Sequence, residues 1–173
     1  MPNAANLTPD SRFLGLFIGK SGSGKTVAEC SFPGRKKVFD FDGRIRGILN
    51  APWIDKSLVD YEYYPPITQA GQVDTFTRIN KDFEKLLNST KLGSCEYDGL
   101  ILDSMTSTTF ALVSQALPLT HAAKSAGDSK GKRIGNLLMP GPEDYGFEAQ
   151  GIYQILAFLR SLPMKYIIVS AHI

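Results

Sequence analysis

The stretch FIGKSGSGKT at residues 17–26 constrains this chain more than any other part of its sequence. Gly19, Gly24, Lys25 and Thr26 match the pattern G-x-x-x-x-G-K-[ST] without deviation, directly after an apolar segment. The glycines let successive backbone N–H groups turn inward, and the helix that follows adds partial positive charge. The pattern therefore predicts a strand, a phosphate-binding loop and a helix in succession.

The same pattern assigns chemistry to the loop. The lysine of such a loop reaches the β- and γ-phosphates of a nucleotide, so Lys25 is predicted to be catalytic. The threonine hydroxyl binds Mg²⁺, which makes Thr26 a predicted metal ligand. We therefore expect ATP and Mg²⁺ as the cofactors. The predicted nucleotide contacts are Gly19, Lys20, Ser21, Gly22, Ser23, Gly24, Lys25 and Thr26.

Apolar runs alternate with helix-forming segments along the chain. Each run is short and continuous, which is typical of a strand buried on both faces. The alternation predicts an α/β fold, a P-loop NTPase core with a parallel sheet sandwiched by helices. The signal is poor over 43–70, where YEYYPPIT is expected as a loop or an edge strand. The predicted strands are 12–18, 36–41, 98–103 and 165–173, and the predicted helices are 26–32, 72–88, 107–117, ending before Pro118, and 145–161.

Two segments differ in character from the rest. Residues 1–11 are polar and are predicted to be a flexible lead, which leaves 12–173 as one core domain. Residues 119–144 are rich in Gly, Ser and Lys and show little periodicity. They are too long for an ordinary connection, so this segment is expected to be either functional or disordered.

Composition and charge exclude several classes of protein. With a net charge of +2, any affinity for nucleic acid must come from a local patch. Cys30 and Cys95 lack the spacing of a disulfide or a metal site, which favours reduced thiols in the cytoplasm. No apolar run reaches the roughly 18 residues that span a bilayer, and the polar N-terminus lacks the features of a signal peptide. We expect a cytoplasmic protein without membrane contact.

A second anchor for Mg²⁺ is expected at the end of a neighbouring strand. Asp103 ends the run GLILD, at the edge where ligands of open α/β sheets bind; helix capping is its alternative role. Ser104 follows it, so a catalytic glutamate is missing from that position. The segment VFDFDGR supplies Asp40 and Asp42 instead, and alternation predicts both on one face. Asp42 is the predicted base, with shaping of an Asp-Gly turn as the alternative.

Four motifs occur in a fixed order along the chain: GKSGSGKT, VFDFDGR, LILDSMT and YIIVSAHI. In this order the chain resembles RecA-like ATPases. It is most similar to the phage-encoded RecA-like nucleotide-binding proteins, which include the Sak-type single-strand annealing ATPases of phage recombination. The likeness covers residues 12–173, and the stretches DFDGR and DYG point to the phage group.

The resemblance implies roles for two further residues. RecA relatives carry a catalytic glutamate after the second strand, and Asp42 stands there with a side chain one methylene shorter. They also carry a polar residue after the fourth strand, commonly glutamine, that senses the γ-phosphate. His172 stands at that position and is predicted to be catalytic. In these relatives at least one more strand follows, so the core is expected to lack C-terminal strands.

The resemblance also implies partners. RecA relatives bind single-stranded DNA through loops, and segment 119–144 is expected to take this role here. From the same resemblance we expect a single-strand binding protein as a partner. We also expect assembly into a homo-oligomeric ring or filament, located in the host cytoplasm. The segment has no aromatic residue for base stacking, so a solvated loop is the alternative. The predicted DNA contacts are Lys124, Lys130, Lys132 and Arg133.

These observations favour an ATP-hydrolysing RecA-like protein that acts on single-stranded DNA in phage recombination or replication. A small-molecule kinase with 119–144 as its lid is an alternative, although kinase lids usually offer several arginines and this segment has one. A nucleotide-dependent assembly module without hydrolysis is another alternative, because the side chain of Asp42 is short for a base.

Overall fold

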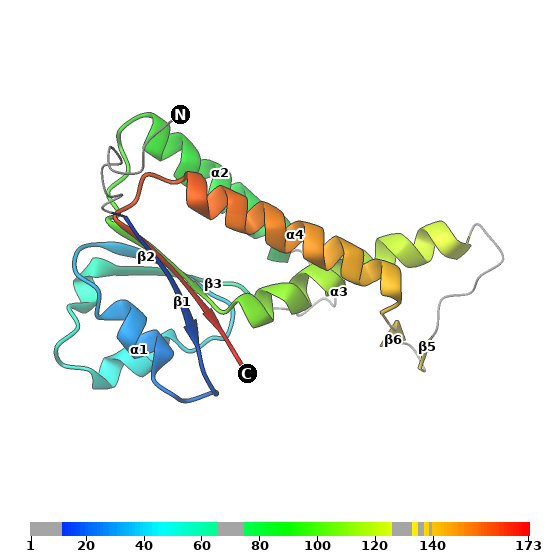
Figure 1. Cartoon of the computed structure of the whole chain (residues 1–173), viewed down its shortest axis with the longest axis horizontal. Helices are drawn as coiled ribbons and strands as arrows, with labels where there is room; N and C mark the ends of the chain where they lie inside the picture. Colours follow the sequence, from blue (N-terminus) through cyan, green and yellow to red (C-terminus); the bar gives the residue numbers. More distant parts are fainter. Residues whose placement is uncertain (1–11, 66–74, 126–132, 135–136, 139) are drawn as a thin grey trace, which may run out of the picture.

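A parallel sheet forms the centre of the molecule (Figure 1). The computed structural model describes residues 12–65, 75–125, 133–134, 137–138 and 140–173. All neighbouring strands of this five-stranded sheet run parallel. In spatial order the strands are β1 (Phe13–Ile18), β7 (Tyr166–Ala171), β4 (Gly99–Asp103), β2 (Lys36–Asp40) and β3 (Val59–Tyr63).

Helices cover the sheet on both sides (Figure 1). One face packs against the short helix α1 (Lys25–Cys30) and the 3-10 helix η2 (Ile45–Asn50), and the 3-10 helix η3 (Lys56–Leu58) leads into β3. The other face packs against α2 (Thr75–Lys91), α3 (Met105–Ser125) and α4 (Pro142–Ser161). A two-stranded antiparallel pair, β5 (Arg133–Ile134) and β6 (Leu137–Leu138), lies between α3 and α4 in the chain.

The apolar runs of the strands fill two cores. In β4, Leu100 and Leu102 pack under α2, α3 and α4, whereas Ile101 between them packs under α1 and η2. All three side chains are fully buried. Because successive side chains of a strand point to opposite faces, an uninterrupted apolar run matches a sheet that is covered on both sides. The prediction of an α/β fold with a helix-covered parallel sheet is confirmed.

The register of the sheet brings together the residues that follow each strand. Asp40 at the end of β2 pairs with Asp103 at the end of β4, and Ile18 at the end of β1 pairs with Ala171 at the end of β7. Since all strands of the sheet run parallel, the predicted phosphate loop, Asp103 and the residues after β2 and β7 meet at the carboxyl ends of the strands. The fold therefore assembles a site from segments that are far apart in the sequence.

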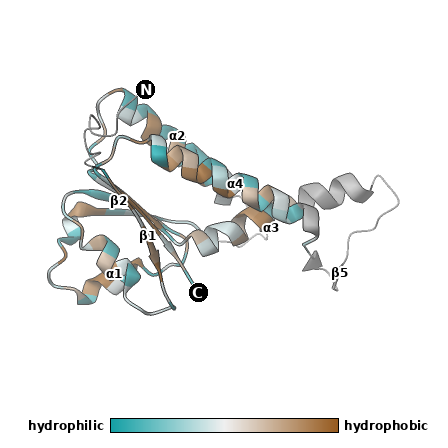
Figure 2. Ribbon diagram, in the orientation of Figure 1, coloured by the Kyte–Doolittle hydropathy of each residue, from teal (hydrophilic) through white to brown (hydrophobic). Residues whose placement is uncertain are grey.

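Strand β1 differs from its prediction, because it is not buried on both faces. It forms one edge of the sheet, with β7 as its neighbour. Leu14, Leu16 and Ile18 are each at least half exposed, at 50%, 61% and 57%, and Figure 2 shows β1 as a hydrophobic strand. A cavity of about 470 Å³ lies between this strand, β7 and α4. The apolar run identified a strand correctly but not its position in the sheet.

The helix predicted over 107–117 is longer in the structure. Helix α3 continues through Pro118 to Ser125, although a proline there removes one helical hydrogen bond. Beyond Ser125, the described residues of segment 119–144 include the strands β5 and β6 and the start of α4. YEYYPPIT begins in β3, at the other edge of the sheet, as the edge-strand alternative predicted. The predicted lead at 1–11 lies outside the described residues.

Cys30 is buried and Cys95 half-buried, and both are free thiols. Among the described residues, none of the helices combines the length and the apolar character that crossing a bilayer requires.

Candidate nucleotide-binding site

The predicted phosphate loop connects β1 to α1. Strand β1 ends at Ile18 and α1 begins at Lys25, so the glycine-rich residues lie between them as the pattern predicts. Gly22 and Gly24 have φ angles of 77° and 86°, in the left-handed region that favours glycine. Gly24 is the residue at the helix N-cap. These two positions explain why glycine is needed where the chain curls into the helix.

Lys25 folds back across the start of its own loop. Its ammonium group donates hydrogen bonds to the carbonyl oxygens of Gly19 at 2.8 Å and Lys20 at 3.1 Å. It also contacts Nδ1 of His172 at 3.2 Å. The cation that would bind phosphate is therefore already positioned over the loop, held by neutral acceptors that an anion can displace.

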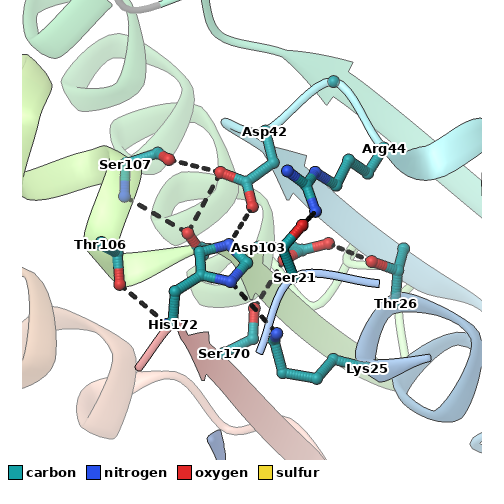
Figure 3. A network of polar contacts seen from close by, with 12 residues as sticks. Ser21, Lys25, Thr26, Asp42, Arg44, Asp103, Thr106, Ser107, Ser170 and His172 are labelled. Atoms are coloured by element: carbon teal, nitrogen blue, oxygen red, sulfur yellow. Dashed lines mark hydrogen bonds and ion pairs between the residues drawn. The ribbon is translucent and has the colours of Figure 1, made fainter. Parts of the chain in front are cut away.

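Asp103 is held by a hydroxyl group on each of its oxygens (Figure 3). Thr26 donates from Oγ1 to Oδ2 at 2.6 Å, and Ser170 donates from Oγ to Oδ1 at 2.6 Å. The carboxylate is 1% exposed and lies beside the first turn of α1. The structure thus brings the two predicted metal ligands together.

The chemistry of these two oxygen donors fits Mg²⁺. This ion prefers oxygen ligands, keeps several waters, and is usually bound by one or two protein groups together with substrate phosphates. Within the described residues there is no cluster of three or more His, Cys, Asp or Glu that could hold a metal by itself. A site with two protein oxygens next to a phosphate loop suits an ion that arrives with a nucleotide.

Asp42 lies in a network of polar side chains from three other segments (Figure 3). Ser107 and Ser104 donate to its Oδ1, the latter at 3.2 Å, and Nε2 of His172 lies 2.5 Å from its Oδ2. Burial alone would raise the pKa of Asp42, but the hydrogen bonds from Ser107 and His172 outweigh it and hold the pKa below its ordinary value. Asp42 is therefore ionised at neutral pH.

His172 connects Asp42 to Lys25. An ammonium group can only donate, so the contact with Lys25 makes Nδ1 of His172 the acceptor. The proton of the neutral ring is then on Nε2, which donates it to Asp42. The backbone N–H of His172 donates to Oγ1 of Thr106 at 2.9 Å, near the start of α3. The predicted catalytic residues Lys25, Asp42 and His172 thus form one chain of contacts.

Asp40 has a different role from the one that alternation suggested. Its Oδ1 accepts the backbone N–H groups of Asp42, Gly43 and Arg44, and its Oδ2 accepts that of Ile45. Strand β2 ends at Asp40, so the alternation of side chains along a strand does not extend to Asp42. The side chain of Asp40 folds into the turn before η2 and fixes the direction in which Asp42 points.

Sequence reasoning missed two further groups at this edge. Arg44 donates from Nη1 to Oγ of Ser21 in the predicted phosphate loop (Figure 3). Glu29 on α1 is fully buried, and neither of its oxygens has a hydrogen-bond partner among the described residues. Burial, with the nearby charge of Asp103, raises the pKa of Glu29 to about 8. Arg44 could have been identified from its place in the segment DFDGR, whereas no pattern in the sequence distinguishes Glu29 as a buried carboxylate.

Two of the predicted DNA contacts lie within the described residues. Lys124 is near the end of α3 and Arg133 is in β5, whereas Lys130 and Lys132 lie outside the described residues. Figure 1 shows α3 running away from the sheet. The structure therefore does not bring Lys124 or Arg133 to the predicted phosphate loop.

Comparison with known proteins leaves the geometry to carry the functional argument. No model of a protein family matches this chain, and no curated protein matches it either.

Proposed function

We propose that this protein binds and hydrolyses ATP with Mg²⁺, as a RecA-like ATPase. The observation that carries the proposal is the meeting of three groups at one edge of a parallel sheet. They are Lys25 over the phosphate loop, the pair of Thr26 and Asp103, and the carboxylate of Asp42. This is the set of parts that phosphoryl transfer needs: a phosphate cradle, a metal anchor and a group that orients water.

Binding would exchange internal contacts for contacts with the nucleotide. The ammonium of Lys25 leaves the carbonyls of Gly19 and Lys20 and binds oxygens of the β- and γ-phosphates. Thr26 and Asp103 hold the Mg²⁺, which when bound neutralises charge on the phosphates. Ser170 keeps Asp103 oriented through its other oxygen.

Asp42 would orient the attacking water. Its lowered pKa makes it a weak proton acceptor, so positioning of the water is its main contribution, with the proton passing to it as the bond forms. His172 holds Asp42 on one side and Lys25 on the other. When Lys25 moves to the phosphates, Nδ1 of His172 is released, so the imidazole responds to the occupied site.

We extend the proposal to single-stranded DNA in phage recombination or replication, with assembly into a ring or filament. Its support is the resemblance to phage RecA-like proteins and the basic residues at Lys124, Lys130, Lys132 and Arg133. Helix α3 starts at Met105, next to Asp103, and leads to this basic segment. The helix therefore joins the candidate nucleotide site to the proposed DNA contacts.

The proposal is tested with Lys25→Ala and Asp42→Asn beside the parent. Calorimetric titration with ADP and a non-hydrolysable ATP analogue, with Mg²⁺ or with EDTA, measures binding, and phosphate release measures turnover. Lys25→Ala should reduce turnover at least 100-fold, because a fixed cation on the transferred group is lost. Asp42→Asn should slow turnover strongly but leave analogue affinity within about threefold.

A matched control is Lys81→Ala, which removes an exposed lysine of α2 far along the chain from the site and should change neither quantity. Turnover by Lys25→Ala at the rate of the parent would overturn the assignment of the phosphate loop. Turnover by Asp42→Asn at the rate of the parent would show that another residue is the base, while the assignment of the phosphate loop would stand. Binding without turnover in the parent would support the assembly module.

A further inference from the structure

Arg44 leaves the same turn as Asp42 but points to the other side of the site (Figure 3). The carboxylate of Asp40 accepts the backbone N–H groups of Asp42, Arg44 and Ile45, so the backbone of this turn is fixed. From it, Asp42 reaches His172 while Arg44 reaches the phosphate loop. One buried carboxylate thus directs an acidic and a basic side chain to two sides of one cleft.

The guanidinium of Arg44 lies at the mouth of the phosphate cradle. Nη1 donates to the hydroxyl oxygen of Ser21, and Arg44 lines a cavity of about 230 Å³ together with Lys25, Thr26 and Asp103. Arg44 is otherwise exposed. The contact with Ser21 uses one of the five N–H groups of the guanidinium and a neutral acceptor, whereas a phosphate accepts two such groups at once and carries charge.

The contacts of Lys25 indicate which phosphate Arg44 would reach. In phosphate loops the lysine binds the β- and γ-phosphates. Here its ammonium lies over the carbonyls of Gly19 and Lys20, at the start of the loop. Ser21 is the next residue, so the end of the cradle that Arg44 contacts is the end that receives the terminal phosphate.

We propose that Arg44 is an arginine finger supplied in cis, which leaves Ser21 and binds the γ-phosphate of ATP during hydrolysis. This inference rests on the ATPase activity proposed above. In the step, the oxygen of water forms a bond to the γ-phosphorus as the bond to the bridging oxygen breaks. The bonding electron pair leaves with ADP, and the proton of water passes to Asp42. Arg44 and Lys25 stabilise the negative charge that spreads over the transferred group.

A finger of this kind contributes to turnover and to recognition of the third phosphate, but not to binding of ADP. The test therefore compares Arg44→Ala and Arg44→Lys with the parent in turnover, in affinity for ATPγS and in affinity for ADP. Arg46→Ala is the matched control, because it removes the same charge from an exposed residue of the 3-10 helix η2, two positions after Arg44.

We expect Arg44→Ala to lower kcat about 1,000-fold and to weaken ATPγS binding, with ADP affinity within threefold of the parent. Arg44→Lys should recover part of kcat, since it restores charge without the two-pronged contact. The control should match the parent.

If the parent hydrolyses ATP and Arg44→Ala hydrolyses it equally fast, Arg44 is not an arginine finger, but the proposed ATPase activity stands. Equal loss of ADP and ATPγS affinity would make Arg44 a general binding residue and also overturn the proposal. A parent that binds no nucleotide would overturn both.

Discussion

At the scale of single residues, Glu29 lies in an environment that is unfavourable to its charge. It is fully buried on α1 without a hydrogen-bond partner among the described residues, and its pKa is raised to about 8. In the unfolded chain its carboxyl group ionises near the ordinary value of 4.5. Between these two pKa values the unfolded state releases a proton that the folded state keeps, so stability falls as the pH rises through this window.

Replacing Glu29 by glutamine should remove this pH dependence. The free energy of unfolding of the parent should decline relative to that of Glu29→Gln by roughly 3 kcal/mol between pH 5 and pH 7.5. Urea denaturation of both proteins at several pH values, in EDTA and without nucleotide, measures the difference. Glu84→Gln, an exposed residue of α2, is the control and should follow the parent. Parallel curves for Glu29→Gln and the parent would mean that Glu29 is ionised in the folded protein.

Residues at fixed positions of a motif could be predicted from the sequence. Residues whose role depends on a contact with a distant segment could not. Lys25 and Thr26 follow from the loop pattern, and Asp103 follows from the end of an apolar strand. Asp42 was predicted from its place after the second strand and His172 from the resemblance, and the structure brings them within hydrogen-bonding distance. The role of the Ser170 hydroxyl depends on the pairing of β4 with β7, which is a contact between distant segments.

At the scale of elements, the turn between β2 and η2 depends on one side chain. Asp40 is 1% exposed, and its two oxygens accept four backbone N–H groups. Asp40→Ala leaves these donors without an acceptor and should lower the free energy of unfolding by about 3 kcal/mol, with loss of ATP turnover as Asp42 and Arg44 lose their positions. Asp40→Asn keeps one acceptor oxygen and should lose less.

Asp55→Ala is the matched control for the turn, because Asp55 caps the short η3 helix at an exposed position and should cost about 1 kcal/mol or less. Chemical denaturation of the four proteins gives the comparison. If Asp40→Ala were no less stable than Asp55→Ala, the turn would be held by its backbone alone.

Elements whose apolar periodicity is strong were predictable, and the exceptions have physical reasons. Ile79, Phe83 and Leu86 recur at helical spacing and are buried on α2 as expected. Pro118 was read as the end of a helix, but α3 tolerates it and continues. Strand β1 was read as buried because its residues are apolar, yet the order of strands that puts it at an edge is a property of the whole sheet.

At the scale of the whole molecule, helix α3 starts beside the candidate site and ends near Lys124, one of the proposed DNA contacts (Figure 1). Neutralising Lys130, Lys132 and Arg133 together should weaken binding of single-stranded DNA at low salt and leave ATP affinity unchanged. The slope of log affinity against log salt should flatten by roughly two units, at about 0.7 per lost phosphate contact.

Fluorescence anisotropy of a labelled oligonucleotide at several salt concentrations measures both quantities. The control neutralises three lysines of α2, Lys81, Lys85 and Lys91, and so changes the net charge by the same amount. Equal slopes for the two triple variants would show that the effect is one of net charge, and the basic segment would then have no specific role in DNA binding.

The meeting of distant segments at the sheet edge has a thermodynamic consequence. The phosphate loop, the turn after β2, the end of β4 and the end of β7 become neighbours only when the register of the sheet is complete. Any unfolding that separates these strands also disrupts the candidate site, so the proposed nucleotide can bind only the folded sheet. A nucleotide present at 100 times its dissociation constant would then add about 2.7 kcal/mol to global stability. If the proposed function holds, the nucleotide stabilises the whole sheet, and resistance to heat and proteolysis then reports the fraction of molecules that have bound it.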